Sequence, residues 1–311
     1  MDAHVKRIIA DIKSLKIQGA RNVAKSAVQA LNLEAETSKS RTPKALGKEL
    51  AAVAELLSAS RPTEPMMRNR LMQMMEFFSQ GASGGKGGEM KNVQKNFARH
   101  GSDLIRKMDD DAKKLALYGA KLIPEGALVL THCHSSTTTR VLKEANRMGK
   151  DITIVCFETR PRYQGRTTAA ELAAAGLDVT LVVDGAMTLF MKKADIVIVG
   201  ADSVTSRGDL INKIGTSTLA HIARMNDVSF FSAAELAKYS PMTMFGNLEK
   251  IEERDHHEIW EKAPRGVKIR NPAFEATAAK YINGYITEAG VIPPQSFFTL
   301  ATEKLGIKIY E

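Results

Sequence analysis

The first third of the chain carries its apolar residues at the spacing of amphipathic helices. Between Val5 and Leu15 the apolar side chains recur three and four residues apart, which places them on one face of a helix. The same spacing, with many Ala and Leu residues that favour helices, recurs in segments 22–31, 44–60, 66–78 and 93–123. Residues 79–92 are rich in Gly and predict a loop, and Gln80 excludes a phosphate loop because that pattern needs a Gly there. These segments predict a helical domain.

After residue 126 the pattern changes to short, almost continuously apolar runs at 127–133, 152–160, 179–184, 195–202 and 228–235. Helical patterns separate these runs, at 137–149, 167–176, 186–194 and 216–226. Strands that are apolar throughout and alternate with helices predict a parallel sheet covered on both faces. We therefore expect an α/β protein: a helical N-terminal domain over residues 1–120, followed by a Rossmann-like catalytic domain with a mainly parallel sheet over residues 121–311.

Ligands of such sheets bind beyond the carboxyl ends of the strands, and this rule directs attention to Cys133. Cys133 ends the first apolar run between His132 and His134. Adjacent strand positions point to opposite faces, so these three side chains are not expected to share a metal ion. Packing alone is one interpretation of the cysteine. The other is a functional thiol, because the helix start at 135–139 offers hydroxyls and backbone N–H groups that would bind a phosphate and lower the thiol pKa.

A second strand end carries Asp202. An aspartate there is often only a cap, but Asn212 and Lys213 follow shortly before the next predicted helix. A carboxylate, a carboxamide and an ammonium at one crevice can hold a polyol and a phosphate while moving protons. In the N-terminal third, Arg21 and Arg61 lie in breaks between helices, where each by itself is compatible with an ordinary loop.

Composition and charge indicate which classes of binding partner are to be expected. The chain has 311 residues, of which 44% are hydrophobic and 25% charged, as in globular proteins. Most of its net charge of +9 comes from residues 1–115, which hold 21 Lys and Arg against 13 Asp and Glu. This excess is either a solvated helical surface or one wall of an anion site; nucleic acid is disfavoured because no RNA-binding aromatic motif accompanies it. Two cysteines, with no signal peptide and no membrane-spanning apolar run, predict a cytoplasmic protein without a membrane partner.

Short motifs occur in a fixed order along the chain: KIQGA, RPT, THCHSS, ETRPRYQG, GADSVTSRGDLINKIGT, AAELAKYSP, NPAFEAT and GVIPP. Together they resemble the family that joins archaeal ribose-1,5-bisphosphate isomerases, methylthioribose-1-phosphate isomerases and the α, β and δ regulatory subunits of the exchange factor for eukaryotic translation initiation factor two. The GAD and NKIGT block is specific to that family. THC followed by ETRP is most similar to its bisphosphate isomerases.

The resemblance implies a homo-oligomer, a dimer or a hexamer of dimers, with Cys133 and Asp202 as the acid–base pair and AMP as an activator. It implies sugar and phosphate contacts at Gly19, Ala20, Arg21, Arg61, Ser135, Ser136, Thr137, Asn212, Lys213 and Lys238. Two positions depart from the family pattern: Gln18 stands where an Arg is expected, and His134 stands where Asn is common.

The implied reaction converts ribose 1,5-bisphosphate into ribulose 1,5-bisphosphate, a step that links AMP degradation to RuBisCO in this family. A sugar phosphorylated on C1 is locked as a ring, so the enzyme must protonate the ring oxygen and remove the C2 proton. Two proton-transfer groups suffice, with no metal and no redox cofactor. We assign Cys133 as the thiolate base and Asp202, protonated in a shielded pocket, as the acid; the reverse assignment stays open.

Two alternatives are retained. One is a non-catalytic regulatory subunit of the translation factor, a class that lacks the Cys–Asp pair. The other is a methylthioribose-1-phosphate isomerase, in which an apolar pocket replaces the second phosphate clamp; the cationic Arg21 and Lys238 count against it.

Overall fold

The computed structural model describes residues 1–307 except 84–88, 248 and 250, so the central part of the predicted loop 79–92 lies outside the described residues. The chain divides into two compact units, Met1–Asp110 and Asp111–Glu311. The division falls inside the long helix α5 (Met90–Leu122), whereas the boundary predicted from the sequence lies after residue 120. Within the described residues, no helix is both long and apolar enough to cross a lipid bilayer.

In its described residues the first unit is built of helices, as predicted: α1 (Ala3–Lys13), α2 (Ala20–Thr37), α3 (Pro43–Ser60), α4 (Pro65–Ser83) and the first part of α5. Local sequence signals set the start of α3: Pro43 occupies the first turn, and the Thr42 hydroxyl accepts a hydrogen bond from the Ala45 N–H at 3.2 Å. One face of α3 is fully buried, and α3 and α2 both pack against α4.

The second unit contains a seven-stranded sheet in the order β10-β9-β7-β4-β1-β2-β3. Its strands are β1 (Leu128–His132), β2 (Thr153–Phe157), β3 (Asp178–Val182), β4 (Ile196–Val199), β7 (Ser229–Ala233), β9 (Gly284–Thr287) and β10 (Gly290–Ile292). All pairings are parallel except that of β10 with β9. A smaller antiparallel sheet consists of β5 (Ser203–Val204), β6 (Leu210–Lys213) and β8 (Phe274–Thr277).

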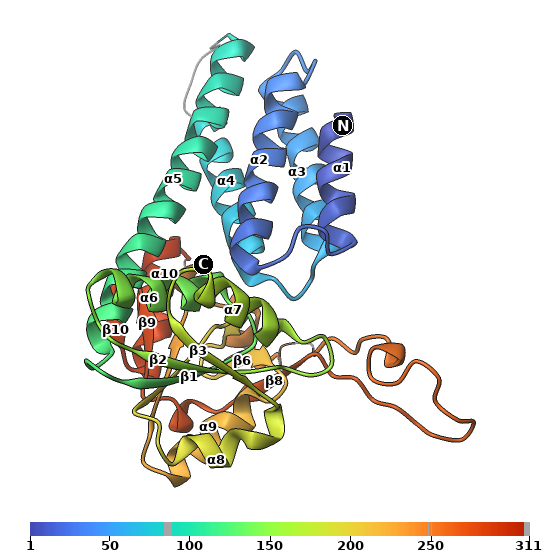
Figure 1. Ribbon diagram of the computed structural model, residues 1–311. Helices are drawn as coiled ribbons and strands as arrows, with labels where there is room; N and C mark the ends of the chain where they lie inside the picture. Colours follow the sequence, from blue (N-terminus) through green and yellow to red (C-terminus); the bar gives the residue numbers. More distant parts are fainter. Residues whose placement is uncertain (84–88, 248, 250, 308–311) are drawn as a thin grey trace. The chain divides into compact units, whose positions relative to one another are not determined.

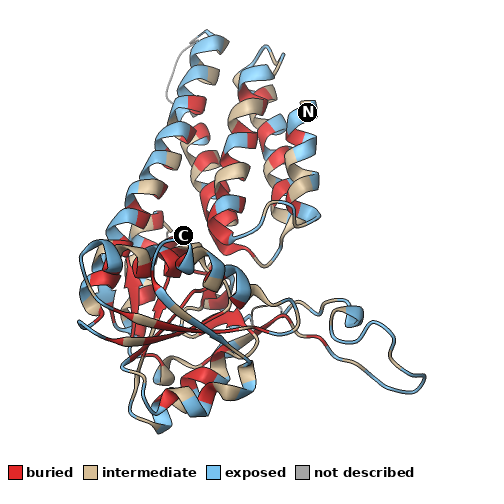
Figure 2. Cartoon of the chain, viewed as in Figure 1, coloured by how far each residue is buried: buried red, intermediate tan, exposed pale blue. Residues whose placement is uncertain are grey.

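Helices cover both faces of the large sheet: α6 (Ser136–Arg147) and α7 (Gln164–Ala173) lie on one face, and α8 (Met187–Met191) and α9 (Thr216–Met225) lie on the other (Figure 1). The chain continues to α10 (Phe297–Leu305). The predicted α/β fold with a mainly parallel sheet is confirmed. Figure 2 shows the central strands as buried, but β3 is largely exposed because it forms the edge of the sheet, and this departs from the expected fully covered strand.

A close approach between β2 and α7 depends on Gly165. A Cβ added at this residue would lie 1.8 Å from the carbonyl oxygen of Phe157, which is far inside the van der Waals limit. The Gly165 N–H also donates a hydrogen bond to the carbonyl of Glu158 at 3.2 Å. Glycine at this position therefore lets the helix begin directly against the carboxyl end of β2.

We expect Gly165→Ala to lower the free energy of unfolding by about 1–3 kcal/mol, because the new methyl group must displace backbone and not a flexible side chain. Urea unfolding followed by circular dichroism measures the change. Gly185→Ala is the matched control, since a Cβ there meets nothing within 4 Å. Equal stability of the two variants would contradict the close approach.

Candidate functional site

The chain leaves β1 through Cys133, whose backbone lies in the left-handed region with φ of 67°. Residues other than glycine rarely adopt this conformation, so the strand direction ends abruptly there. The turn leads into α6, where the Ser135 hydroxyl caps the helix by accepting a hydrogen bond from the Thr138 N–H at 3.3 Å. Cys133 therefore lies at the carboxyl edge of the parallel sheet, between a strand and a helix N-terminus.

The neighbouring strand β4 ends at the same edge and leads through Gly200 to Asp202. A Cβ at Gly200 would lie 2.5 Å from the Cβ of Ser135, so only glycine lets the end of β4 approach the start of α6 this closely. The Asp202 N–H donates a hydrogen bond at 3.0 Å to a carbonyl of β6, which ties the turn to the small sheet. Two strand ends thus bring Cys133 and Asp202 to one edge.

Cys133 is partly exposed as a residue, but desolvation of its sulfur raises the pKa of the thiol to about 11. Lys213 opposes this rise, whereas the Asp202 carboxylate adds to it. The His134 N–H and Arg254 also act to lower the pKa. The sequence predicts that the helix start lowers the thiol pKa; this prediction is wrong, because loss of hydration around the sulfur outweighs the His134 N–H and the nearby cations. The thiol therefore keeps its proton at neutral pH.

Lys213 is a buried cation at this site. It ends β6 and is almost fully buried, and its ammonium lies 4.7 Å from the centre of the Phe274 ring. Burial lowers the pKa of Lys213, while the Cys133 sulfur, when it is deprotonated, and the Asp202 carboxylate act to raise it. The thiol of Cys133, the carboxylate of Asp202 and the ammonium of Lys213 therefore interact electrostatically in a partly desolvated site.

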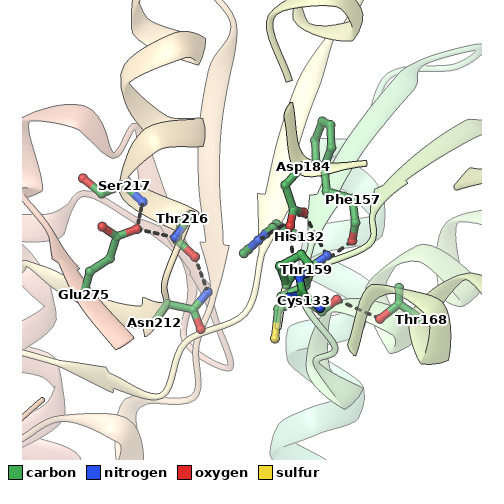
Figure 3. Close-up of polar contacts among 12 residues, drawn as sticks. His132, Cys133, Phe157, Thr159, Thr168, Asp184, Asn212, Thr216, Ser217 and Glu275 are labelled. Atoms are coloured by element: carbon green, nitrogen blue, oxygen red, sulfur yellow. Dashed lines mark hydrogen bonds and ion pairs between the residues drawn. The ribbon is translucent and has the colours of Figure 1, made fainter. Parts of the chain in front are cut away.

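Two further residues that are predicted to contact the substrate, Lys238 and Asn212, form hydrogen bonds with other residues of the second unit. The buried Lys238 donates from Nζ to the carbonyl of Ala201 at 2.7 Å, next to Asp202. The Asn212 amide donates to the Thr216 hydroxyl at 3.1 Å, at the start of α9 (Figure 3). Lys238 thus hydrogen-bonds to the turn that carries Asp202, whereas Asn212 links β6 to the start of α9.

Two helix N-termini at this edge differ in what they can bind. At the start of α9, the N–H groups of Gly215 and Ser217 both donate to the Glu275 carboxylate, at 2.6 and 2.9 Å. Figure 3 shows Glu275 beside Ser217, so a side chain of the protein already fills this anion position. In α6, the first turn contains the predicted Ser136 and Thr137, and the cap is a neutral hydroxyl. The start of α6 is therefore the better place for a phosphate.

The first unit carries the predicted contact residues Gly19, Ala20, Arg21 and Arg61. Gly19, with φ of 82°, precedes α2, which begins at Ala20. The buried Arg21 guanidinium donates to the Met108 carbonyl at 2.6 Å and to the Asp109 carboxylate at 2.8 Å. Arg61 donates to the buried carboxylate of Glu64 at 2.8 Å. Both arginines of this predicted phosphate clamp, Arg21 and Arg61, therefore contact carboxylates within their own unit.

The histidines beside the cysteine point to different partners. His132 is buried, and burial lowers its pKa to about 4; its Nε2 lies 4.0 Å from the Asp184 carboxylate. His134 Nδ1 lies 3.1 Å from the Thr168 hydroxyl. Among the described residues, the side chains that come within 4.8 Å of one another as a potential metal-ligand group are Asp255, His256 and His257, all exposed.

Sequence reasoning missed the residues that fix the cysteine. The Cys133 N–H donates to the Thr159 hydroxyl, and the Thr168 hydroxyl donates to the Cys133 carbonyl. Arg254 and Glu275 were also missed. Arg254 acts to lower the pKa of Cys133, and Glu275 accepts a hydrogen bond from the Gly215 N–H before α9. The only available signal was that Thr159 falls inside the ETRP motif directly after a predicted strand.

Comparison with known proteins identifies similar chains. Residues 16–294 match the model of the Initiation factor 2 subunit family. The ribose 1,5-bisphosphate isomerase of Archaeoglobus fulgidus is 38% identical over 95% of this chain and 91% of its own length. The methylthioribose-1-phosphate isomerase of Geobacter metallireducens is 35% identical over 92% of this chain and 86% of its own. The crystal structure of translation initiation factor eIF-2B from Pyrococcus horikoshii OT3 superposes with a TM-score of 0.78 and 29% identity, covering 94% of this chain and 98% of that one.

The charge relation between Lys213 and Cys133 can be measured directly. Lys213→Met removes the cation that opposes the rise, so we expect the thiol pKa to move above its wild-type value of about 11. The pH dependence of iodoacetamide alkylation, read by mass spectrometry on the Cys133 peptide, gives this pKa. Cys156, which is buried in the core, is the internal reference. An unchanged or lower Cys133 pKa in the variant would show that Lys213 does not act on the thiol.

Proposed function

The chain belongs to the Initiation factor 2 subunit family, and on this basis we propose that it is an aldose–ketose isomerase that converts ribose 1,5-bisphosphate into ribulose 1,5-bisphosphate. Relatives named as two kinds of sugar-phosphate isomerase support the reaction class. The higher identity to the bisphosphate isomerase supports the substrate. The structural observation that carries the proposal is that the parallel strands β1 and β4 end at the same edge of the sheet and lead to Cys133 and Asp202, where the charge of the buried Lys213 acts on the thiol.

The reaction needs two groups that exchange protons with the sugar. One group removes the C2 proton, and the electrons of that C–H bond form a C1=C2 double bond. The bond from C1 to the ring oxygen breaks, and the ring oxygen takes a proton from the second group. The resulting enol then loses the proton of its C2 hydroxyl and gains one at C1, which gives the ketone. The protons balance over the cycle, so a thiol and a carboxylate are sufficient.

The state of the thiol supports one assignment of the two roles. Because burial raises the pKa of Cys133 to about 11, the thiol enters the reaction protonated. We therefore assign Cys133 as the acid that protonates the ring oxygen and Asp202 as the base that removes the C2 proton, which reverses the first assignment made from the sequence. Asp202 is the remaining group of the pair, and its charge attracts Lys213, which acts to raise the pKa of Lys213.

The substrate carries two phosphates, and cations and helix-terminal N–H groups are the chemistry that binds them. In the second unit we assign this role to Lys213, Lys238 and the start of α6 at Ser135, Ser136 and Thr137, with Asn212 as a sugar contact. In the first unit the proposed contacts are Gly19, Ala20, Arg21 and Arg61. Binding through Arg21 or Arg61 requires the exchange of a carboxylate partner for phosphate.

We further propose that the protein acts as a homo-oligomer and that AMP activates it. Both follow from the family resemblance. Sedimentation velocity of the purified chain tests the first, and assays with and without AMP test the second.

The activity assay decides between the enzyme and a non-catalytic regulatory subunit. We expect wild-type protein to form ribulose 1,5-bisphosphate from ribose 1,5-bisphosphate, and Cys133→Ser and Asp202→Asn each to lower kcat about 10²–10⁴-fold, the usual contribution of an acid–base group. Product is measured by coupled assay or by ³¹P NMR. Cys156→Ala is the matched control, because Cys156 is a core residue of β2. Turnover of methylthioribose 1-phosphate in preference to the bisphosphate would assign the other isomerase activity instead.

The pH profile tests which group is the acid. A thiol that must be protonated gives a kcat/KM that stays level as pH rises from about 8 to 10 and falls as pH passes its pKa of about 11. A thiolate base of the same pKa would instead make kcat/KM rise about tenfold per pH unit over that interval. Measurement above pH 7.5 avoids titration of the substrate phosphates, whose second pKa is about 6. A tenfold rise per unit that Cys133→Ser abolishes would restore the base assignment.

A further inference from the structure

Two threonines from distant parts of the sequence hold both backbone polar groups of Cys133. The Cys133 N–H donates to the Thr159 hydroxyl at 2.8 Å, and the Thr168 hydroxyl donates to the Cys133 carbonyl at 2.9 Å. Both threonines are fully or almost fully buried, with exposed fractions of 0% and 1%. Because water does not reach them, these hydrogen bonds have no ready substitute when one partner is removed.

The conformation of Cys133 explains why such bonds matter. Its φ of 67° lies in the left-handed region, which costs a residue with a Cβ roughly 1–2 kcal/mol. The surrounding structure must hold the residue there, or the turn relaxes to an ordinary conformation. In this conformation the sulfur points away from Thr159 and Asp184 (Figure 3). The direction of the thiol is therefore set by what fixes the backbone of Cys133.

Thr159 is itself fixed in a single hydrogen-bonding role. Its hydroxyl donates to the Phe157 carbonyl at 3.0 Å, which leaves an oxygen lone pair for the Cys133 N–H. Its own N–H donates to the Asp184 carboxylate at 2.8 Å, and the next N–H, of Arg160, donates to the same carboxylate at 2.7 Å. Asp184 thus holds the turn after β2, and that turn presents the Thr159 hydroxyl to Cys133.

We propose that Thr159 is a positioning residue that aims the Cys133 thiol in the isomerase reaction, and that Asp184 acts through Thr159. The inference rests on the proposed function for its kinetic consequence, while the aim of the thiol is measurable without any substrate. Thr159 does not touch the reacting atoms; it controls Cys133, one of the two residues whose side chains do. A misplacement of a catalytic group by about 1 Å can cost roughly 10²-fold in rate.

A purely structural role for Thr159 predicts a different result. In that case removal of its hydroxyl lowers stability and leaves the thiol of the folded protein unchanged. A positioning role predicts that the folded variant carries an altered thiol, because Cys133 also receives a hydrogen bond from the His134 N–H and feels the charge of Lys213. Both influences favour the thiolate, and both depend on where the sulfur lies.

The test uses the full chain with Thr159→Val, which keeps the size of the side chain, and Thr159→Ser, which keeps the hydroxyl. For Thr159→Val we expect kcat to fall about 10–100-fold with KM within about threefold of wild type. We expect the Cys133 pKa, read from the pH dependence of alkylation, to rise by about half a unit or more. Thr159→Ser should restore both values to near wild type. Thr153→Val, at the opposite end of β2, is the matched control.

If Thr159→Val does not fold, Asp184→Asn carries the test, since its carboxamide retains one acceptor oxygen for two N–H groups; we expect a roughly 3–10-fold fall in kcat. A folded Thr159→Val with wild-type kcat and thiol pKa would overturn the inference, as would a Thr159→Ser variant as impaired as Thr159→Val. If wild-type protein forms no product, the proposed function fails. In that case the thiol pKa alone decides the positioning role. A pKa that shifts in Thr159→Val and not in Thr159→Ser upholds the role, and an unshifted pKa in Thr159→Val refutes it.

Discussion

Parallel pairing of β1 between β2 and β4 is the constraint on which the candidate site depends. Strands that run in the same direction end at the same edge, so the turns after all three meet there. Those turns carry Cys133, Thr159 and Asp202. An antiparallel neighbour would send its following turn to the opposite edge. Glycines at 165 and 200 complete the arrangement, because each lets a helix start or strand end approach a neighbour more closely than a Cβ allows.

The same pairing explains how much could be predicted from the sequence. Apolar runs alternating with helical patterns predict the parallel sheet, and the carboxyl-edge rule then singles out Cys133 and Asp202 from local pattern alone. The small sheet of β5, β6 and β8 escaped prediction because its strands have two to four residues and no clear alternation. Thr159 and Thr168 escaped for another reason: their bonds to Cys133 span 26 and 35 residues and exist only once strand and helix have docked.

For the pKa of the Cys133 thiol, the local sequence motif predicts a shift in the wrong direction. A helix start beside Cys133 suggests a lowered pKa, since dipole and N–H groups favour the thiolate. The structure adds burial, which acts against the charged form and dominates, so the pKa is raised. Burial is a property of all the segments that surround the sulfur, and no single motif reports it. The Cys133 environment therefore favours a proton donor, and the choice of roles follows from packing more than from motif.

The negative charge of a bound substrate would further favour the protonated form of the Cys133 thiol. The Asp202 carboxylate already raises the pKa of the thiol, and a bound phosphate is a second anion acting in the same direction. Lys213 is an opposing cation whose pKa is lowered by burial, and an anion beside it acts to raise that pKa. A phosphate at Lys213 would then share the ammonium with Asp202, and less of its charge would act on Cys133. A sugar bisphosphate bound as proposed would thus favour the charged form of Lys213 and the protonated thiol, which is the combination that a general acid beside a phosphate clamp requires.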